Sequence, residues 1–397
     1  MITLTPPQLP LADAFCEVAG GFAWWYVDLV DNDGNGVVFI AGFALPFLPM
    51  ARETSASAAP ATPRQAPSVN LAVYEGGRQV WYALQELDPE AASTSSSEGA
   101  DDHHFGGSRL RVRRETDASG RARISVDVDV DIVIDGMARA QGRIVVEGAA
   151  RFDDGGRAAD SNVDGNVGGN VVHDWSPQTG PSRGSAALTL DGVSWQMSGR
   201  GYHDRNGSLL PLRELGIKTW WWGRLSSEDE ERIVYALEPE VPAGPEGPVR
   251  VIGVIVDAHG RTTHREDLHF KVTRQHRSWF GVDIVDAVAI VDHAGEVFVE
   301  AVISDVLESG PFYVRSLWRS EKAFGVFEQV QPARIGLERY RRLVDMRVAR
   351  RCSAAPAEEA IKISLSLWLP LFCGSARTRF RRLARCWLQR LMGRVPA

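Results

Sequence analysis

Residues 124–134 read ISVDVDVDIVI, which alternates apolar and polar side chains along most of its length. Three aspartates, Asp127, Asp129 and Asp131, fall on one side of the alternation, and valines and isoleucines fall on the other. Successive side chains of a β-strand point to opposite faces of the sheet, so a period of two predicts a strand with one apolar and one acidic face. This segment therefore indicates a half-buried strand.

Shorter runs of the same kind recur along the chain, separated by Gly, Asp, Asn and Pro, and they predict further strands. They cover residues 36–43, 71–74, 143–147, 186–190, 193–197, 233–237, 249–256, 268–273, 296–304, 312–317 and 361–368. The pair Asp191-Gly192 predicts a tight hairpin between two of them. Few segments show helical periodicity, so the fold class we predict is all-β, with antiparallel barrels or sandwiches.

The chain has 397 residues, more than the ~100–200 usual for one domain, so we expect two core-bearing domains. We place the boundary near residues 215–225, which gives an N-terminal domain (1–215), a C-terminal domain (216–370) and a tail (371–397). Three stretches rich in small and polar residues predict long loops between strands. These are residues 53–67, 90–102 and 152–170.

Charge is unevenly distributed within the net value of −7. Residues 332–397 carry 15 Lys or Arg and 4 Asp or Glu, which leaves 29 and 47 for residues 1–331, the body of the chain. The net charge is therefore about −18 for the body and +11 for residues 332–397. An acidic body argues against a nucleic-acid binder, because phosphate binding requires clustered cations.

Residues 375–393 predict a basic amphipathic helix. Its apolar stripe contains Phe380, Leu383, Ala384, Trp387, Leu388, Leu391 and Met392. Such a helix suits peripheral contact with a membrane, where cations meet anionic headgroups and aromatic rings enter the boundary layer. It equally suits a helix that packs on its own barrel, and both interpretations stay open.

Cysteine usage and the termini indicate a cytoplasmic protein. The four cysteines are scattered without Cys-x-x-Cys spacing, which predicts free thiols in a reducing compartment. No basic segment followed by an apolar one opens the chain, so no secretory signal is expected. The longest apolar run, residues 37–48, is shorter than the ~20 residues of a spanning helix and contains Pro46, so no membrane crossing is expected.

Five short motifs combine polar and aromatic residues: WWYVD (24–28), HDW (173–175), GYHDRNG (201–207), WWWGR (220–224) and GPFYVR (310–315). With these motifs the chain resembles the hydroxyneurosporene synthase family, the carotenoid 1,2-hydratases, from about residue 14 to residue 317. The most specific pieces are the His-x-Trp and Tyr-x-Asp pairs and the tryptophan-rich motif that ends in Gly-Arg.

This resemblance implies a pair of lipocalin-like β-barrel domains and a cofactor-free reaction that adds water across the terminal C=C bond of an acyclic carotenoid. By motif matching, the family's catalytic residues fall on His173, Trp175, Tyr202 and Asp204. Relatives of this fold also include cyclase and isomerase-like members that act on other apolar polyenes, so the fold does not fix the substrate.

These residue types suit alkene hydration on chemical grounds. A carboxylic acid protonates an alkene only while it is itself protonated, and burial among aromatic rings raises the pKa of Asp204 as that step requires. The positive charge of Arg205 would lower the pKa of Asp204 if the two side chains were close, but adjacent side chains of a strand face opposite ways. The rings of Trp175 and Tyr202 would stabilise the carbocation, and His173 would position the attacking water or accept its proton.

Structural roles compete with these chemical ones. Asp204 precedes Asn206-Gly207 and suits a turn, Trp175 and Tyr202 suit an ordinary barrel core, and His173 alone suits a hydrogen-bonded polar residue. Trp220, Trp221 and Trp222 would line the pocket or pack between domains, with Arg224 bridging to a carboxylate. Consecutive strand residues cannot all face one cavity, so at least one of the three is expected to be packing.

Substrate contacts are expected from Trp25, Trp195, Trp220 and Trp222, and no metal site is expected. Asp101-Asp102-His103-His104 holds metal-friendly groups in a predicted loop without a further ligand at recognisable spacing. No P-loop, dinucleotide glycine fingerprint, Gly-x-Ser-x-Gly or His-Glu-x-x-His motif is present, so no cofactor is expected. Three functions follow in order: a hydratase of a lipophilic polyene, a cyclase or isomerase, and a lipocalin-like carrier.

Overall fold

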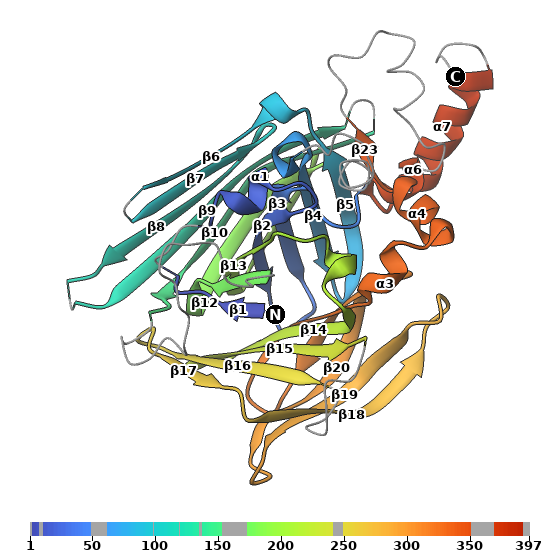
Figure 1. The fold of residues 1–397 in the computed structure, drawn as a ribbon. Helices are drawn as coiled ribbons and strands as arrows, with labels where there is room; N and C mark the ends of the chain where they lie inside the picture. The colour runs from blue at the N-terminus through green and yellow to red at the C-terminus, as the bar shows by residue number, and fades with distance from the viewer. Residues whose placement is uncertain are drawn as a thin grey trace.

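The computed structural model describes residues 2–7, 11–48, 62–97, 99–118, 120–134, 137–152, 173–240, 249–350 and 369–391. In these residues the chain forms two curled, almost entirely antiparallel sheets that lie one above the other (Figure 1). The predicted all-β class is confirmed. Both sheets are open half-barrels, because the hydrogen-bonded strand order does not return to its first strand in either.

The first sheet has fifteen strands, with β6 at one end of its main path and β23 at the other. Its strands are β1 (Ile2–Leu4), β2 (Phe22–Val30), β3 (Gly36–Phe43), β4 (Pro67–Glu75), β5 (Arg78–Glu86), β6 (Ala92–Ser97), β7 (Ala100–Phe105), β8 (Ser108–Thr116), β9 (Ala122–Ile134), β10 (Ala138–Ala150), β11 (His173–Pro177), β12 (Thr179–Leu190), β13 (Val193–Ser208), β23 (Ala349–Arg350) and β24 (Gly374–Ser375).

The second sheet has nine strands, in the order β17-β16-β15-β14-β22-β21-β20-β19-β18. They are β14 (Ile217–Ser226), β15 (Glu230–Pro239), β16 (Arg250–Asp257), β17 (Thr262–Arg265), β18 (Leu268–Arg277), β19 (Asp283–Asp292), β20 (Val297–Ser309), β21 (Tyr313–Arg319) and β22 (Phe324–Val330). The consecutive strands of the first sheet thus end at Ser208, and the second sheet begins at Ile217. After Val330 the chain returns to the first sheet, where β23 and β24 both pair with β5.

Helices are short and lie mainly in the returning tail. They are α1 (Ala14–Glu17), α3 (Pro332–Ile335), α4 (Glu338–Asp345), α6 (Leu369–Phe372) and α7 (Arg379–Leu391). The predicted C-terminal helix is therefore present over most of its expected length. Its apolar stripe is not covered by the barrel at three positions, since Phe380, Trp387 and Leu388 are 69%, 45% and 57% exposed. In the described part of the chain, no helix is long and apolar enough to span a bilayer.

Several strand and turn predictions are confirmed. The stretch 124–134 lies inside β9, and its valines and isoleucines are buried except Val133. The hairpin at Asp191-Gly192 joins β12 to β13, and both residues have positive φ, 50° and 84°, as the twist of a two-residue hairpin requires. The predicted strand at 361–368 lies outside the described residues, as do most of the predicted loops at 53–67 and 152–170.

The loop predicted at residues 90–102 is wrong. This stretch contains β6 and the start of β7, which pair as a hairpin at the edge of the first sheet. The inward-facing residues of this hairpin include Asp101 and His103, which are 6% and 2% exposed, so polar side chains occupy core positions here. The apolar alternation that identifies a strand in the sequence is therefore missing.

Buried side chains form one core inside each sheet and a third core between the two sheets. The core of the first sheet contains Trp25, Val27 and Leu29 of β2, and that of the second contains Trp221 and Trp318. The core between the sheets contains Trp222 of β14 together with side chains from both sheets. Strand β2 is thus buried on both faces, with alternate residues in two different cores.

A buried ion triad joins the two sheets. The Arg224 guanidinium on β14 donates from Nε to both carboxylate oxygens of Asp28 on β2, at 3.1 Å each, and from Nη1 to Glu231 Oε1 on β15 at 3.1 Å. All three side chains are fully buried. The expectation that Arg224 bridges to a carboxylate is confirmed, and the carboxylate of Asp28 belongs to the opposite sheet.

Removing Asp28 should destabilise the whole chain. We expect Asp28→Ala to lower the free energy of unfolding by about 3–5 kcal/mol, because it leaves a buried guanidinium without one of its two counter-ions. Urea denaturation followed by circular dichroism measures this loss. Glu228→Ala is the matched control, since Glu228 binds Arg183 and Arg200 of the first sheet while being 64% exposed. A loss as small for Asp28→Ala as for the control would contradict a structural role of the triad.

Candidate active site

Alternation along β13 separates the predicted site residues onto two faces of the first sheet. Tyr202, Asp204 and Asn206 stand opposite Asp28, Tyr26 and Trp24 of β2, on the face that looks toward the second sheet. His203 and Arg205 stand opposite Val27 and Trp25 on the other face. Arg205 therefore points away from Asp204, as the strand geometry predicts, and its guanidinium donates to the carbonyl of Pro7.

Three hydrogen bonds hold the Asp204 side chain in the face that looks toward the second sheet. Its Oδ2 accepts from Trp175 Nε1 and from the Tyr202 hydroxyl, at 3.0 Å each. Its Oδ1 accepts from Asn206 Nδ2 at 3.1 Å. The alternative of a turn residue is not supported, because Asp204 lies inside a sixteen-residue strand.

Burial makes Asp204 a weak acid. Desolvation raises the pKa of its carboxyl to about 8, more than the hydrogen bonds from Trp175 and Tyr202 lower it. The negative charges of Glu328 and Asp28 raise it further. Oδ2 accepts two hydrogen bonds and Oδ1 only one, so Oδ1 is the oxygen with more room for the proton of the neutral acid. Asp204 is therefore protonated at neutral pH, as a general acid must be.

His173 lies behind this group. Its Nε2 is 3.2 Å from Asn206 Oδ1 and 3.0 Å from the Tyr235 hydroxyl. Desolvation lowers the pKa of its imidazole to about 4, so the ring is neutral. The ring is enclosed by Phe22, Trp24 and Trp220. The structure thus brings together all four predicted catalytic residues, with Asn206 linking His173 to Asp204.

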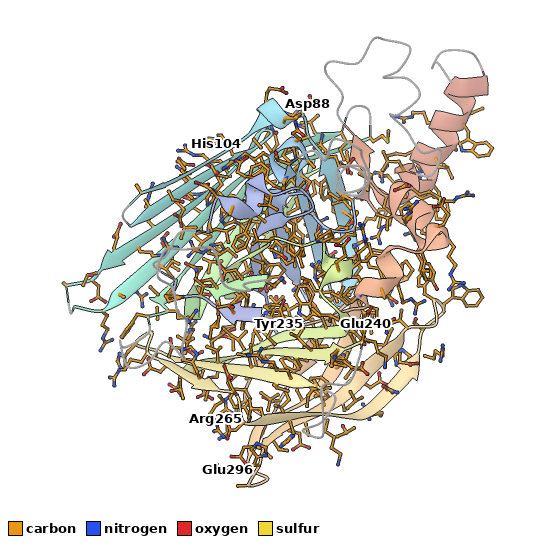
Figure 2. The ribbon with its side chains drawn as sticks, in the orientation of Figure 1. Asp88, His104, Tyr235, Glu240, Arg265 and Glu296 are labelled. Atoms are coloured by element: carbon orange, nitrogen blue, oxygen red, sulfur yellow. The ribbon has the colours of Figure 1, made fainter. Side chains whose placement is uncertain are left out.

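A cavity of about 420 Å³ opens between the two sheets in front of Asp204. Asp204, Asn206 and Tyr235 line it, and the rest of its wall is largely aromatic and aliphatic. Tyr235 lies where the two sheets meet (Figure 2). Both sheets contribute residues to the cavity wall. The part of the chain that follows β22 contributes Leu343, Val344, Arg347, Phe372 and Arg379. A site of this size and character fits a lipophilic ligand.

The predicted substrate-binding tryptophans divide between the cavity and the cores. Trp220 and Trp222 line the cavity, and Trp221 between them packs on Phe270 inside the second sheet, so one of the three is packing as expected. Trp25 and Trp195 do not line the cavity. Trp25 packs against His103 with ring centroids 4.2 Å apart and the rings tilted by 35° in the core of the first sheet, and Trp195 packs against the same core.

Sequence reasoning missed several cavity residues. Trp24 lines the cavity in place of its neighbour Trp25, and Tyr26 and Tyr235 also face it. Trp24 and Tyr26 lie on the same face as Asp204 because their strand pairs with the strand of the Tyr-x-Asp motif. The register of that pairing is visible only in the structure.

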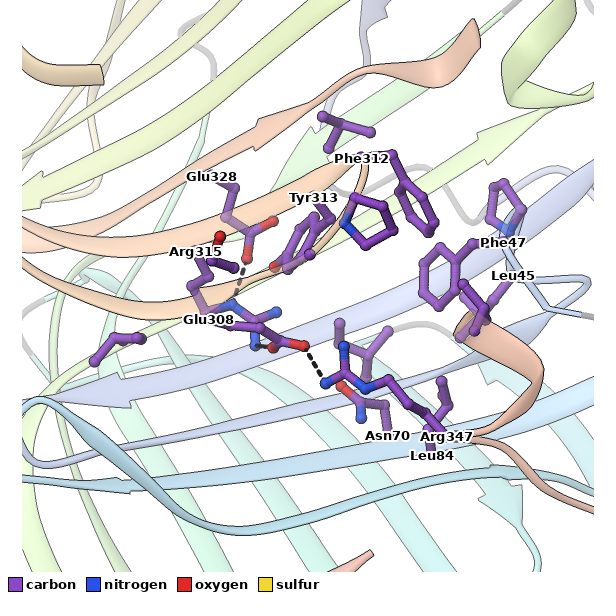
Figure 3. A pocket seen from close by; sticks show the side chains of 18 of the residues that line it. Leu45, Phe47, Asn70, Leu84, Glu308, Phe312, Tyr313, Arg315, Glu328 and Arg347 are labelled. Carbon is purple, nitrogen blue, oxygen red and sulfur yellow. Dashed lines mark hydrogen bonds and ion pairs between the residues drawn. The ribbon is translucent and has the colours of Figure 1, made fainter. Parts of the chain in front are cut away.

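A charged cluster in the cavity wall was also missed. Arg315 Nε donates to Glu328 Oε1 at 2.9 Å, and Arg347 Nη2 donates to Glu308 Oε1 at 2.7 Å (Figure 3). Arg315 Nη1 also donates to the Tyr74 hydroxyl at 2.9 Å. The cavity is therefore apolar along most of its wall and carries fixed charges on the side formed by β20, β21 and β22.

The acidic and histidine side chains at 101–104 contact arginines and an aromatic ring. Asp101 pairs with Arg114, Asp102 pairs with Arg109, and His103 is buried against Trp25. Across the described part of the chain, no group of three His, Cys, Asp or Glu side chains is arranged to hold a metal ion.

The chain matches the model of a known protein family. The family model described as "Carotenoid hydratase CrtC" matches residues 39–356, which is most of the chain.

Two named relatives are similar in sequence. The chain is 26% identical to an acyclic carotenoid 1,2-hydratase from Rubrivivax gelatinosus over 313 residues, 76% of this chain and 65% of that protein. It is 25% identical to a hydroxyneurosporene dehydrogenase from Chlorobaculum tepidum over 332 residues, 79% of this chain and 81% of that protein. The chain thus spans less than two thirds of the length of the Rubrivivax relative.

Solved structures with a similar course of the chain include CghA in complex with Sch210972 and kievitone hydratase from Nectria haematococca. CghA aligns with a TM-score of 0.47 at 11% identity, over 84% of this chain and 96% of that one. Kievitone hydratase aligns with a TM-score of 0.40 at 10% identity, over 83% and 98%. Likeness at this level carries no argument about activity.

The raised pKa of Asp204 predicts a dependence of stability on pH. Between pH 5 and pH 7 the folded protein keeps a proton on Asp204 that an unfolded aspartate, with a pKa of ~3.9, has lost. Stability from this group is therefore complete below about pH 4 and is lost as pH rises toward 8. Relative to Asp204→Asn, the wild type should lose up to about 1.4 kcal/mol of unfolding free energy per pH unit in this window. Parallel curves from urea denaturation would show that Asp204 is ionised in the folded state.

Proposed function

This chain belongs to the carotenoid hydratase family, and we propose that it adds water across the terminal C=C bond of an acyclic carotenoid or a similar lipophilic polyene. The observation that carries this proposal is the buried carboxyl of Asp204, whose pKa is raised, in the wall of a largely aromatic and aliphatic cavity. The family match and the name of the Rubrivivax relative support the carotenoid as substrate class.

The first step is proton transfer from Asp204 to the alkene. The O–H bond at Oδ1 breaks and a C–H bond forms at the less substituted carbon, which leaves a positive charge on the tertiary carbon. Tyr202 and Trp175 donate to Oδ2, so they hold the carboxyl in place and stabilise the carboxylate that this step creates. The reaction requires a proton donor, water and a base, so we propose that it needs no cofactor.

Aromatic rings stabilise the carbocation. Trp220, Trp222 and Tyr235 line the cavity next to Asp204, and π-faces attract a cation without offering it a nucleophilic atom. Trp220 stacks on Tyr235 with ring centroids 5.0 Å apart, which fixes both rings. A fixed aromatic wall excludes water from the cation except where polar groups hold it.

His173 is proposed as a positioning residue. It does not line the cavity, but it contacts Asn206 and Tyr235, which do. Asn206 in turn donates to Asp204 Oδ1. His173 thereby fixes the amide that orients the acid and the hydroxyl beside it, and its neutral ring does not lower the pKa of Asp204 as a cation would.

We further propose peripheral membrane contact through α7, which would give a lipophilic substrate a short route into the cavity. Phe372 and Arg379, at the start of this tail segment, line the cavity. Phe380, Trp387 and Leu388 project from α7 into solvent, and Arg381 and Arg385 are exposed on the same helix. Exposed aromatic rings beside arginines suit an anionic bilayer surface.

Product analysis in oxygen-18 water tests the acid assignment. With lycopene or neurosporene as substrate, we expect wild type to incorporate heavy oxygen and Asp204→Asn to be slower by about 10²-fold or more, because an amide cannot supply the proton. The wild-type rate should fall as pH rises through about 8, where Asp204 loses its proton.

Asp174→Asn is the matched control for this experiment. Burial raises the pKa of Asp174 to about 7, yet its side chain does not line the cavity and lies near Arg205. It should keep the wild-type rate. Full turnover by Asp204→Asn would refute the acid, and a product of unchanged mass would indicate cyclisation or isomerisation in place of hydration.

A vesicle experiment tests the membrane contact. We expect the triple variant Phe380→Ser, Trp387→Ser, Leu388→Ser to bind sedimenting vesicles of anionic phospholipid about tenfold more weakly than wild type, because three apolar side chains no longer enter the interface. The control Val193→Ser, Val297→Ser removes two exposed apolar residues from β13 and β20. Equal binding by all three proteins would exclude α7 as the contact.

A further inference from the structure

The cavity wall contributed by the second sheet carries a carboxylate that faces the first sheet. Glu328 on β22 stands opposite Trp222 of β14 and Arg315 of β21 in the strand register, and all three line the cavity. The Trp222 ring lies 5.3 Å from that of Tyr26 and 5.4 Å from that of Tyr202, which donates to Asp204. Glu328 and Asp204 therefore belong to opposite walls of the same cavity.

One oxygen of Glu328 is fixed and the other is open to the cavity. Oε1 accepts from Arg315 Nε at 2.9 Å, and Arg315 is itself 1% exposed (Figure 3). Among the described residues, no hydrogen bond reaches Oε2, and 15% of the side chain remains accessible. A carboxylate paired with a guanidinium is a hydrogen-bond acceptor with a fixed direction.

Two hydroxyl groups near Glu328 also lack partners. The hydroxyls of Tyr26 and Tyr313 are buried in the cavity wall, and neither has a hydrogen-bond partner within the described ranges. Burial raises the pKa of both phenols well above the ordinary value, so both keep their protons and are donors. A hydrocarbon ligand offers them no hydrogen-bond acceptor, and a buried polar group without a partner is destabilising.

A water molecule bound between these groups would supply their missing hydrogen bonds. A buried water needs two to four polar partners, and here two phenol donors and one carboxylate acceptor face the same cavity. The charge of Glu328 raises the pKa of Tyr26, Tyr313, Tyr235 and Asp204, so its carboxylate lies within electrostatic reach of each of them. The site thus has the chemistry that a hydratase needs to keep water beside an apolar substrate.

We propose that Glu328 is the general base of the reaction and that Tyr26 and Tyr313 hold the attacking water in front of it. This inference rests on the proposed hydratase function. The water oxygen forms a C–O bond to the tertiary carbon while one of its O–H bonds breaks and the proton passes to Glu328 Oε2. The proton then returns through cavity water to the Asp204 carboxylate, so the cycle consumes one alkene and one water.

Deuterium exchange separates the two proton transfers. In D₂O with lycopene as the probe, Glu328→Gln should form hydrated product at least about 100-fold more slowly than wild type. It should still add deuterium to the recovered lycopene, because Asp204 protonates the alkene and the uncaptured cation loses a proton again. Asp204→Asn should show neither hydration nor exchange. Mass spectrometry of substrate and product measures both rates.

Two further variants control for structural damage. Asp292→Asn also removes a largely buried carboxylate from an arginine of the second sheet, Arg265, but Asp292 does not line the cavity, so this variant should keep the wild-type hydration rate. Glu328→Asp keeps the carboxylate and should recover part of the rate. Circular dichroism confirms that each variant is folded.

The outcomes distinguish a wrong assignment of the base from a wrong assignment of the reaction. Hydration by Glu328→Gln within threefold of wild type, or loss of hydration and exchange together in a folded Glu328→Gln, overturns the assignment of Glu328 as base. Absence of both hydration and exchange in wild type overturns the proposed function itself, and the base assignment with it. Exchange without hydration in Glu328→Gln alone supports both.

Discussion

Arg224 binds carboxylates from both sheets at a place that solvent does not reach, and the cavity depends on this contact. A buried guanidinium is stable only while its counter-ions stay in position, so Asp28 on β2 and Glu231 on β15 fix the distance and orientation of the two sheets. Tyr202 stands beside Asp28 on the same face, with its ring 5.5 Å from the Arg224 guanidinium. The side chain that holds Asp204 is thus anchored to the element that joins the sheets.

Two carboxyl groups of the cavity wall have different hydrogen-bond partners. The hydrogen bonds to Asp204 come from neutral donors, so desolvation dominates and its pKa is raised. Glu328, a few side chains away on the other wall, is held by Arg315. Enzymes that need both a proton donor and a proton acceptor at one pH commonly obtain them by separating the environments of two acids in this way. Here the neutral donors to Asp204 come from β11 and β13 of the first sheet, and the guanidinium that binds Glu328 comes from β21 of the second.

Strand alternation made the fold and part of the site predictable. The pattern of β9 and the opposite directions of Asp204 and Arg205 follow from a period of two, and both are seen. Trp24 and Trp25 could not be assigned to the cavity or the core, because β2 is buried on both faces and its sequence shows no alternation. Glu328 and Arg315 were missed for a different reason. Their pairing depends on the register of β21 against β22, which joins residues thirteen positions apart and leaves no local signal.

The tail returns from the second sheet to pair with β5 of the first, and on the way it supplies Arg347, Phe372 and Arg379 to the cavity. These residues are synthesised after all the strands from β1 to β22. Domains fold from the N-terminus as they are synthesised, so most of both sheets can form before this part of the cavity wall exists. Completion of the cavity is therefore a late event in the synthesis of the chain.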